Sequence, residues 1–232
     1  MNISEQNLLQ LAKKLKKEYQ QVRHYQQDPP ASAISKTVLG VLVVTILSQA
    51  SNDVRTKKIY CELKERYSTW EQLADADPDE VVDVLRAGGL ARQKTRYLQS
   101  VLSHVHCDFG DYSLETLSDW DNDKCYQYLT DLPGVGPKTA ACVLLFGLNR
   151  DVFPVDTHVA RISTRLGLVD ASDSAEKIQK ILSEYIPGGW SLSLHLNMLE
   201  HGRTICKARN PDCVNCSVSD VCQFRNSNND DN

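Results

Sequence analysis

The 232-residue sequence contains no apolar run long enough to cross a lipid bilayer. Its most apolar stretch, VLGVLVVTIL at residues 38–47, is well short of the roughly 20 residues that a spanning helix needs. The stretch is apolar on every side, which predicts a helix buried in the middle of a bundle. The first residues contain no apolar signal-peptide core, so we expect a cytosolic protein in a prokaryote, or a nuclear or organellar protein otherwise.

Strand-like alternation of polar and β-branched residues is also absent, as are internal repeats. Apolar residues instead recur at helical spacing, which predicts an all-α protein. The DPPAS segment at 28–32 breaks the helical pattern and is expected to cross between substructures. The predicted helices span 7–22, 38–48, 54–66, 79–86, 91–105, 121–130, 137–148, 157–166, 173–186 and 191–205.

The chain lacks an excess of basic residues: 26 Lys and Arg face 30 Asp and Glu, for a net charge of −4. This balance argues mildly against a nucleic-acid partner, although it leaves room for a local basic face. The lysines of the first predicted helix are expected to form a solvated face rather than a binding patch. These are Lys13, Lys14, Lys16 and Lys17.

The eight cysteines fall into two groups. One group is scattered through helical patterns and predicts small buried apolar side chains; it comprises Cys61, Cys107, Cys125 and Cys142. The other group has the spacing C-x6-C-x2-C-x5-C and comprises Cys206, Cys213, Cys216 and Cys222. Four clustered thiols suit zinc or an iron–sulfur cluster, and the wide gaps favour the cluster. Disulfides are a weaker interpretation because nothing else indicates an oxidising compartment.

The segment LPGVGPKTAACVLL at 132–145 predicts a glycine-rich turn that runs directly into a helix. Pro137 suits the first helical position, where its missing N–H needs no partner. Lys138 follows at the positive end of the helix dipole, where an ammonium is disfavoured. Either its side chain extends into solvent, or the helix lowers the pKa of its amine for a chemical purpose.

Five segments resemble the endonuclease III family of DNA glycosylases over residues 35–225. LPGVGPKTA is similar to its helix–hairpin–helix, PVDTHVARI (154–162) to its catalytic aspartate segment, and HGRTICKARNPDCVNCSVSDVC (201–222) to its 4Fe–4S loop. TILSQASND (45–53) and GGLARQKTRYL (88–98) match two further segments. The segments occur in the order that the family has.

The resemblance implies a fold with two modules and a DNA-binding groove between them. Residues 31–150 would form a six-helix barrel module with the helix–hairpin–helix. Residues 1–30 and 151–225 would form a helical module with one 4Fe–4S cluster on the four clustered cysteines, and 226–232 a disordered tail. The partner would be duplex DNA containing damaged bases or abasic sites, bound by a monomer with no membrane association, cytoplasmic and nucleoid-associated in a prokaryote.

The same resemblance assigns catalysis to Lys138 and Asp156. Lys138 would attack the sugar C1′ of a flipped nucleotide and form a Schiff base that permits β-elimination. Its alternative role is that of a solvated or phosphate-contacting lysine. Asp156 would stabilise the oxocarbenium-like sugar, and its position also predicts a cap for the helix that begins at Thr157; the two roles are compatible.

Further residues are assigned to DNA binding. Gln49 would fill the space left by the flipped base and Leu90 would insert beside it; the alternatives are a polar helix end and a core leucine. His158 would lie near the pocket, or on a helix surface. Hairpin glycines and basic side chains near the cysteines would contact phosphates, although solubility alone could explain the latter. These residues are Gly134, Gly136, Arg203, Lys207, Arg209 and, as part of a basic surface, Arg225.

The resulting hypothesis is a base-excision glycosylase and abasic-site lyase for oxidised pyrimidines. The alternatives are the same fold acting on another lesion, such as uracil or thymine in mismatches, and a non-catalytic DNA-binding or redox-sensing iron–sulfur protein; a zinc-dependent binding module is a third. Three departures from the family pattern leave the substrate range undetermined. Pro137 replaces a basic residue, Asn52 adds a residue, and Ala91 replaces a larger side chain.

Overall fold

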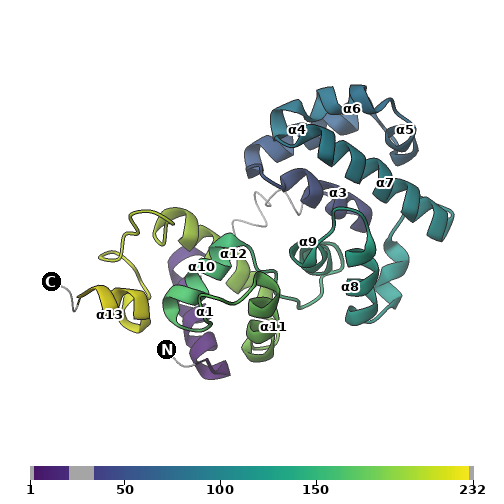
Figure 1. The fold of residues 1–232 in the computed structure, drawn as a ribbon. Coiled ribbons are helices and arrows are strands. Elements are labelled where there is room, and N and C mark those ends of the chain that lie inside the picture. The colour runs from purple at the N-terminus through teal and green to yellow at the C-terminus, as the bar shows by residue number, and fades with distance from the viewer. Residues whose placement is uncertain (1–2, 21–33, 230–232) are drawn as a thin grey trace. The chain divides into compact units, whose positions relative to one another are not determined.

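The computed structural model describes residues 3–20 and 34–229, and all regular structure within those ranges is helical. The all-α prediction is therefore confirmed. The chain forms two compact units: one contains α1 and the elements from Asp151 onward, and the other ends at Arg150 (Figure 1). No helix in the described ranges is long and apolar enough to cross a membrane. The DPPAS segment and residues 21–22 lie outside the described residues.

The unit that ends at Arg150 is built around α3 (Val38–Ser48). Every residue of this helix from Val38 to Leu47 is buried, as the apolar run predicted. Its neighbours in chain order are α4 (Asp53–Arg66), α5 (Trp70–Ala74), α6 (Pro78–Leu85), η2 (Arg86–Gly88), α7 (Ala91–Phe109), η3 (Glu115–Asp119), α8 (Asn122–Asp131), α9 (Pro137–Cys142) and η4 (Val143–Gly147).

Polar caps fix where these helices begin. The Asp77 side chain accepts a hydrogen bond from the Asp79 amide at 2.8 Å, and Pro78 occupies the first position of α6. Asn52, the residue that departs from the family pattern, accepts from the Arg55 amide at 2.9 Å and caps α4. The extra residue therefore starts a helix.

The second unit packs α1 (Glu5–Tyr19) against α10 (Thr157–Leu166), α11 (Ala175–Tyr185) and α12 (Ser191–Thr204), as Figure 1 shows. Leu8, Leu11 and Leu15 of α1 enter one apolar cluster with residues of α10 and α12. The opposite face of α1 carries the lysines, and Lys14 pairs with Asp220 at 2.6 Å. The predicted solvated face is thus observed, with one of its members tied to a distant loop.

Three details differ from the sequence-based expectations. Residues 226–229, expected in the disordered tail, belong to α13 (Gln223–Asn229). This helix is held by a cation–π contact, in which the Arg165 guanidinium lies 4.6 Å from the centroid of the Phe224 ring. The helix expected over 137–148 changes to a π-helix at η4. Cys61 and Cys107 are exposed, not buried, whereas the other two scattered cysteines are buried.

The exposure of Cys61 and Cys107 follows from helix geometry. Cys61 lies two residues from both Ile59 and Leu63, which are buried. Two residues correspond to more than half a turn of an α-helix, so Cys61 points away from that face. Cys107 has the same relation to the buried Val105.

Candidate functional site

The turn between α8 and α9 adopts, at Gly134, a left-handed backbone conformation that favours glycine. Gly134 has φ +77°, and a Cβ at this position would lie 2.3 Å from the ring of Tyr97. Both the left-handed conformation and the close approach of Tyr97 therefore require glycine. Gly136 is the N-cap of α9 and is exposed, and a Cβ there would meet no atom within 4 Å. Nothing in the fold itself requires glycine at 136, so the space beside it is open to a partner.

Lys138 occupies the second position of α9, after Pro137 at the first position as predicted. Its side chain is partly buried, and the next residue, Thr139, is buried at 5% exposure. The amine is therefore attached to a rigid part of the chain, one turn from the glycine turn. A primary amine that is held in this way can act as a nucleophile toward a carbon electrophile.

Asp156 caps α10, as the sequence predicted. Its Oδ1 accepts hydrogen bonds from the amides of His158 at 2.9 Å and Val159 at 2.8 Å. Within the described residues, Oδ2 receives no hydrogen bond. One oxygen thus fixes the carboxylate to the helix and the other is available for chemistry. Asp156 and Lys138 belong to different units of the chain.

Gln49 and Leu90 lie in the same unit as the glycine turn. Gln49 follows the last residue of α3, and its Nε2 donates to the Gly134 carbonyl at 3.0 Å. Leu90 has 53% of its surface exposed and a φ of +54°. The structure therefore brings Gln49 to the hairpin and shows that Leu90 is not a core leucine.

His158 is held between two helices rather than exposed on a helix surface. A Cβ on Gly202 of α12 would lie 2.5 Å from its Nδ1, so the ring packs directly on that backbone. The Arg161 Nη2 lies 3.1 Å from the same Nδ1. A guanidinium can only donate, so Nδ1 accepts and the imidazole proton lies on Nε2. This arrangement gives His158 a structural role in joining α10 to α12.

The four clustered cysteines line a single pocket of the second unit. Its walls include the apolar side chains of Ile162, Leu166 and Val218. Within the described residues, no three His, Cys, Asp or Glu side chains form a group that could hold a single metal ion. The four thiols line one cavity, and an iron–sulfur cluster is a group that spans a cavity and takes four thiolates.

Hydrogen-bond donors around the pocket suit negatively charged sulfur. The Arg165 Nη1 donates to the Cys206 Sγ at 3.3 Å, and the His201 Nε2 lies 3.6 Å from the Cys216 Sγ. Burial raises the pKa of Cys216 to about 11, so its thiol must lose a proton to bind metal. Burial lowers the pKa of His201 to about 4, with Arg161 contributing, so its ring is neutral. The residues present thus fit an iron–sulfur cluster.

Arginines hold the backbone of the loop that carries these cysteines. Arg165 donates to the carbonyls of Lys207 at 2.7 Å and Ala208 at 3.1 Å, and the Arg161 Nε donates to the Cys206 carbonyl at 3.0 Å. Arg225, expected on the basic surface, is partly buried and donates to the Cys213 carbonyl at 3.1 Å. The predicted phosphate-contacting residues Arg203, Lys207 and Arg209 are all exposed.

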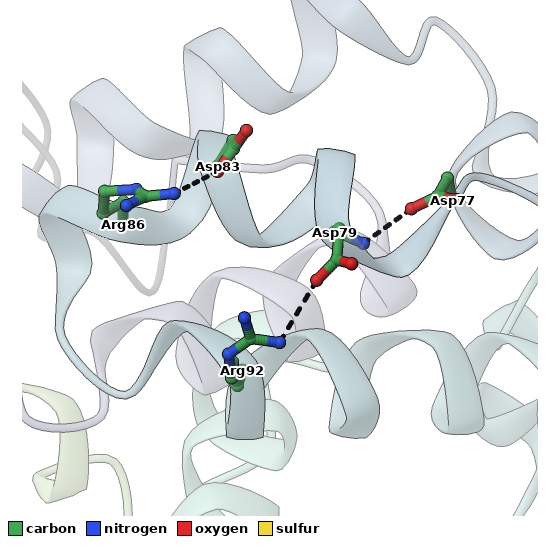
Figure 2. Close-up of polar contacts among 5 residues, drawn as sticks. All are labelled: Asp77, Asp79, Asp83, Arg86 and Arg92. Carbon is green, nitrogen blue, oxygen red and sulfur yellow. Dashed lines mark hydrogen bonds and ion pairs between the residues drawn. The ribbon is translucent and has the colours of Figure 1, made fainter.

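Sequence reasoning overlooked three arginines near Leu90. An open hollow in the surface is lined by Leu90, Arg86, Arg92 and Arg96, together with Val82, Ala91 and Gln93. Figure 2 shows that Arg86 pairs with Asp83 and that Arg92 reaches Asp79, at 3.1 Å. These ion pairs are exposed and contribute little to stability, so the guanidiniums can exchange carboxylates for phosphates at small cost. The spacing of arginines in GGLARQKTRYL was a signal that could have indicated Arg92 and Arg96; Arg86 lies two residues before that segment.

Known protein families match this chain over most of its length. The model of the HhH-GPD superfamily base excision DNA repair protein matches residues 43–188. The model of the iron-sulfur binding domain of endonuclease III matches residues 206–222, which begin and end at clustered cysteines. Both models agree with the resemblance drawn from the sequence.

Individual relatives give the same result. Endonuclease III of Thermotoga maritima is 35% identical over 187 residues, covering 79% of this chain and 82% of the relative. Endonuclease III of Sulfolobus acidocaldarius is 31% identical over 192 residues, covering 82% and 83%.

Solved structures extend this likeness to the fold. The structure of a non-covalent endonuclease III–DNA complex superposes with a TM-score of 0.80 at 27% identity, covering 98% of this chain and 99% of that chain. The relatives favour an enzyme over the non-catalytic alternative. The chain belongs to the endonuclease III family, and it is a base-excision DNA glycosylase with an iron–sulfur binding domain.

Proposed function

We propose that this glycosylase removes oxidised pyrimidines from duplex DNA and cleaves the resulting abasic site through a Schiff base on Lys138. The observation that carries the proposal is the position of the Lys138 amine, on the first turn of α9 directly after the hairpin. A similar chain, 28% identical with a TM-score of 0.80, is described as a trapped endonuclease III–DNA covalent intermediate. That likeness supports covalent chemistry in this chain.

The proposed reaction begins when the neutral Lys138 amine attacks C1′ of the flipped nucleotide. The N–C1′ bond forms as the glycosidic bond breaks, and the base leaves with the electron pair and takes up a proton. Asp156 accepts the proton that the amine loses and stabilises positive charge on the sugar with Oδ2, while Oδ1 remains bonded to the helix amides. The C1′–O4′ bond then breaks, O4′ is protonated, and a Schiff base remains.

Elimination follows from that intermediate. Loss of a proton from C2′ drives cleavage of the C3′–O bond, and the 3′ phosphate leaves with the electron pair. Water then hydrolyses the Schiff base and regenerates the Lys138 amine. The lysine is therefore required for the lyase step as well as for base removal.

We assign DNA recognition to groups on both units. Gln49 and Leu90 would occupy the space left by the flipped base. Gly134 and Gly136 would allow the hairpin backbone to approach phosphates. His158, which the resemblance placed near the pocket, would act only by joining α10 to α12. Basic side chains would bind the backbone electrostatically; these are Arg203, Lys207 and Arg209, together with Arg86, Arg92 and Arg96 near Leu90.

We further propose that the four clustered cysteines hold one 4Fe–4S cluster, and that the unit ending at Arg150 is the six-helix barrel module. When bound, the cluster cross-links the loop between Cys206 and Cys222. The chain itself then presents the basic side chains of that loop to phosphates. Brown colour and about four irons per chain are expected, whereas a zinc protein would be colourless.

Borohydride trapping tests the proposed reaction. Wild type is incubated with a duplex that contains one abasic site, and a covalent adduct is expected. The Lys138→Ala variant should lose the adduct and at least about 10³-fold of strand cleavage, while retaining duplex binding. Wild-type binding without an adduct would refute the lyase. A lesion panel with oxidised pyrimidines, uracil and mismatched thymine then tests the substrate class.

A further inference from the structure

Lys94 of α7 is buried, with 1% of its surface exposed, and no other lysine or arginine in the described part of the chain is buried. An ammonium removed from water is costly unless hydrogen bonds replace its hydration. Burial, with a contribution from Arg55, lowers the pKa of Lys94 to about 8. The free-energy cost of burying this ammonium indicates that the amine has a specific role in the structure.

The Lys94 Nζ donates to two main-chain carbonyls, that of Leu47 at 2.7 Å and that of Gly88 at 2.8 Å. The Leu47 carbonyl lies in the last turn of α3, where carbonyls lack helical partners. Leu47 precedes Gln49 by two residues, and Gly88 precedes Leu90 by two residues. The Lys94 side chain thus bonds to the main chain two residues before Gln49 and two residues before Leu90, the residues that we assign to the space left by a flipped base.

The two segments also touch each other. A Cβ on Gly89 would lie 3.3 Å from the Ala50 carbonyl oxygen. Ala50, Gly89 and Leu90 all have positive φ, at +49°, +70° and +54°. Such conformations are disfavoured for residues other than glycine and persist only where the surroundings hold them.

The same face of α7 reaches the hairpin. Tyr97 lies about one turn after Lys94 and packs against Gly134 so closely that a Cβ there would be 2.3 Å from its ring. Gln49 donates to the Gly134 carbonyl. The first turns of α7 therefore contact three segments, 47–50, 88–90 and 133–136, which we call the three-segment surface.

We propose that Lys94 is a positioning residue that fixes the spacing of the segments carrying Gln49 and Leu90 and so sets how efficiently the enzyme extracts a stacked base. A methionine has a similar length and could fill the space, but it cannot donate to either carbonyl. The inference rests on the proposed function, because it requires that Gln49 and Leu90 act on the base stack.

The test compares one oxidised pyrimidine, 5-hydroxyuracil, in two duplexes. In the first the lesion is paired within a stacked helix, and in the second it lies in a bulge of unpaired bases, where extraction costs little. Single-turnover base release is measured for Lys94→Met and for Leu98→Ala at a temperature at which circular dichroism shows folded protein. Leu98 is a fully buried residue one turn along α7 and serves as the matched control for lost stability.

We expect Lys94→Met to lose about tenfold more activity on the paired lesion than on the bulged lesion, which corresponds to about 1.4 kcal/mol. Leu98→Ala should change both substrates alike. An equal loss on both duplexes, or no loss on either, would overturn the inference. If the methionine variant is unfolded at the assay temperature, Lys94→Leu, which likewise has no N–H donor in its side chain, is tested by the same criterion.

Two further variants separate this inference from the proposed function. Leu90→Ala and Gln49→Ala should themselves lose activity selectively on the paired lesion. If they do and Lys94→Met does not, only the inference about Lys94 fails. If neither alanine variant is selective, the proposed roles of Gln49 and Leu90 fail, and the inference that rests on them fails too.

Discussion

The three-segment surface and the cysteine loop are ordered by different means. The segments of the first are helix ends and short turns next to buried helices. The cysteine loop, residues 205–222, contains only the 3₁₀ turn η5 (Ser219–Val221), and Val218 is its one buried residue. Hydrogen bonds from three arginines hold its backbone instead.

The difference shows what each region needs. A surface made of helix ends takes its shape from the core beneath it, so the polypeptide alone can define it. A loop with almost no core buries too little apolar area to offset its conformational entropy. Such a loop needs cross-links, and four cysteines around a shared ligand supply them.

Loss of the cluster should have the largest effect, because it should disorder the cysteine loop and leave the three-segment surface intact. Cys216→Ser is expected to lower iron content and to leave the loop cleavable by protease, whereas the unit that ends at Arg150 stays resistant. The loop's two exposed basic residues, Lys207 and Arg209, would no longer be held toward phosphates. The slope of log Kd against log salt on undamaged duplex should therefore become less steep by about 2.

The matched control is Cys61→Ser, which replaces an exposed cysteine outside the loop. It should leave iron content, protease resistance and salt slope at their wild-type values. A Cys216→Ser protein that lacks iron but keeps the wild-type protease pattern and slope would show that the polypeptide orders the loop unaided.

A smaller effect is expected on the free energy of unfolding, which should fall more for an alanine at one hairpin glycine than at the other. Gly134→Ala must adopt a left-handed conformation and displace Tyr97, so we expect a loss of about 2 to 4 kcal/mol in the free energy of unfolding. Gly136→Ala meets open space and should change that free energy by less than about 1 kcal/mol. Urea unfolding measures both variants, and equal losses would contradict the role given to the packing of Tyr97.

A further effect concerns the pH dependence of stability and Lys94. Its pKa is about 8 in the folded chain against an ordinary value of 10.5, so the unfolded chain binds more protons between those pH values. The free energy of unfolding should therefore rise with pH from about 8 to 10.5, relative to Lys94→Met measured in parallel. The comparison removes the contribution of tyrosines that titrate in the same range. A constant difference between the two proteins across that range would mean that the folded-state pKa of Lys94 is unchanged.

Much of the helical architecture could be predicted from local chemistry. Asp77, Pro137 and Asp156 were identified from the sequence as helix starts, because caps act within three residues of themselves. The buried run at 38–47 was equally clear. Lys138, Asp156 and the four clustered cysteines came from motif and spacing.

Features that depend on tertiary contacts could not be predicted in this way. α13 is polar and forms where Phe224 meets Arg165. Arg225 was expected on the surface but donates to a loop carbonyl across twelve residues. Lys94 lies on the apolar face of α7 at helical spacing from Leu98, Val101 and Val105, a pattern that could have indicated burial. Its two carbonyl partners follow from the fold alone.

The packing of α1 has a consequence for biosynthesis. Its apolar face, with Leu8, Leu11 and Leu15, is covered by residues of α12, which ends at Thr204. A ribosome that adds about 5 to 20 residues per second needs about 10 to 40 s to synthesise the chain between these helices. For that interval the nascent chain carries an uncovered leucine face, and the unit built around α3, which ends at Arg150, is complete before α12 has been made. Translation order therefore leaves the first helix of the chain without its packing partner until almost the whole chain has been made.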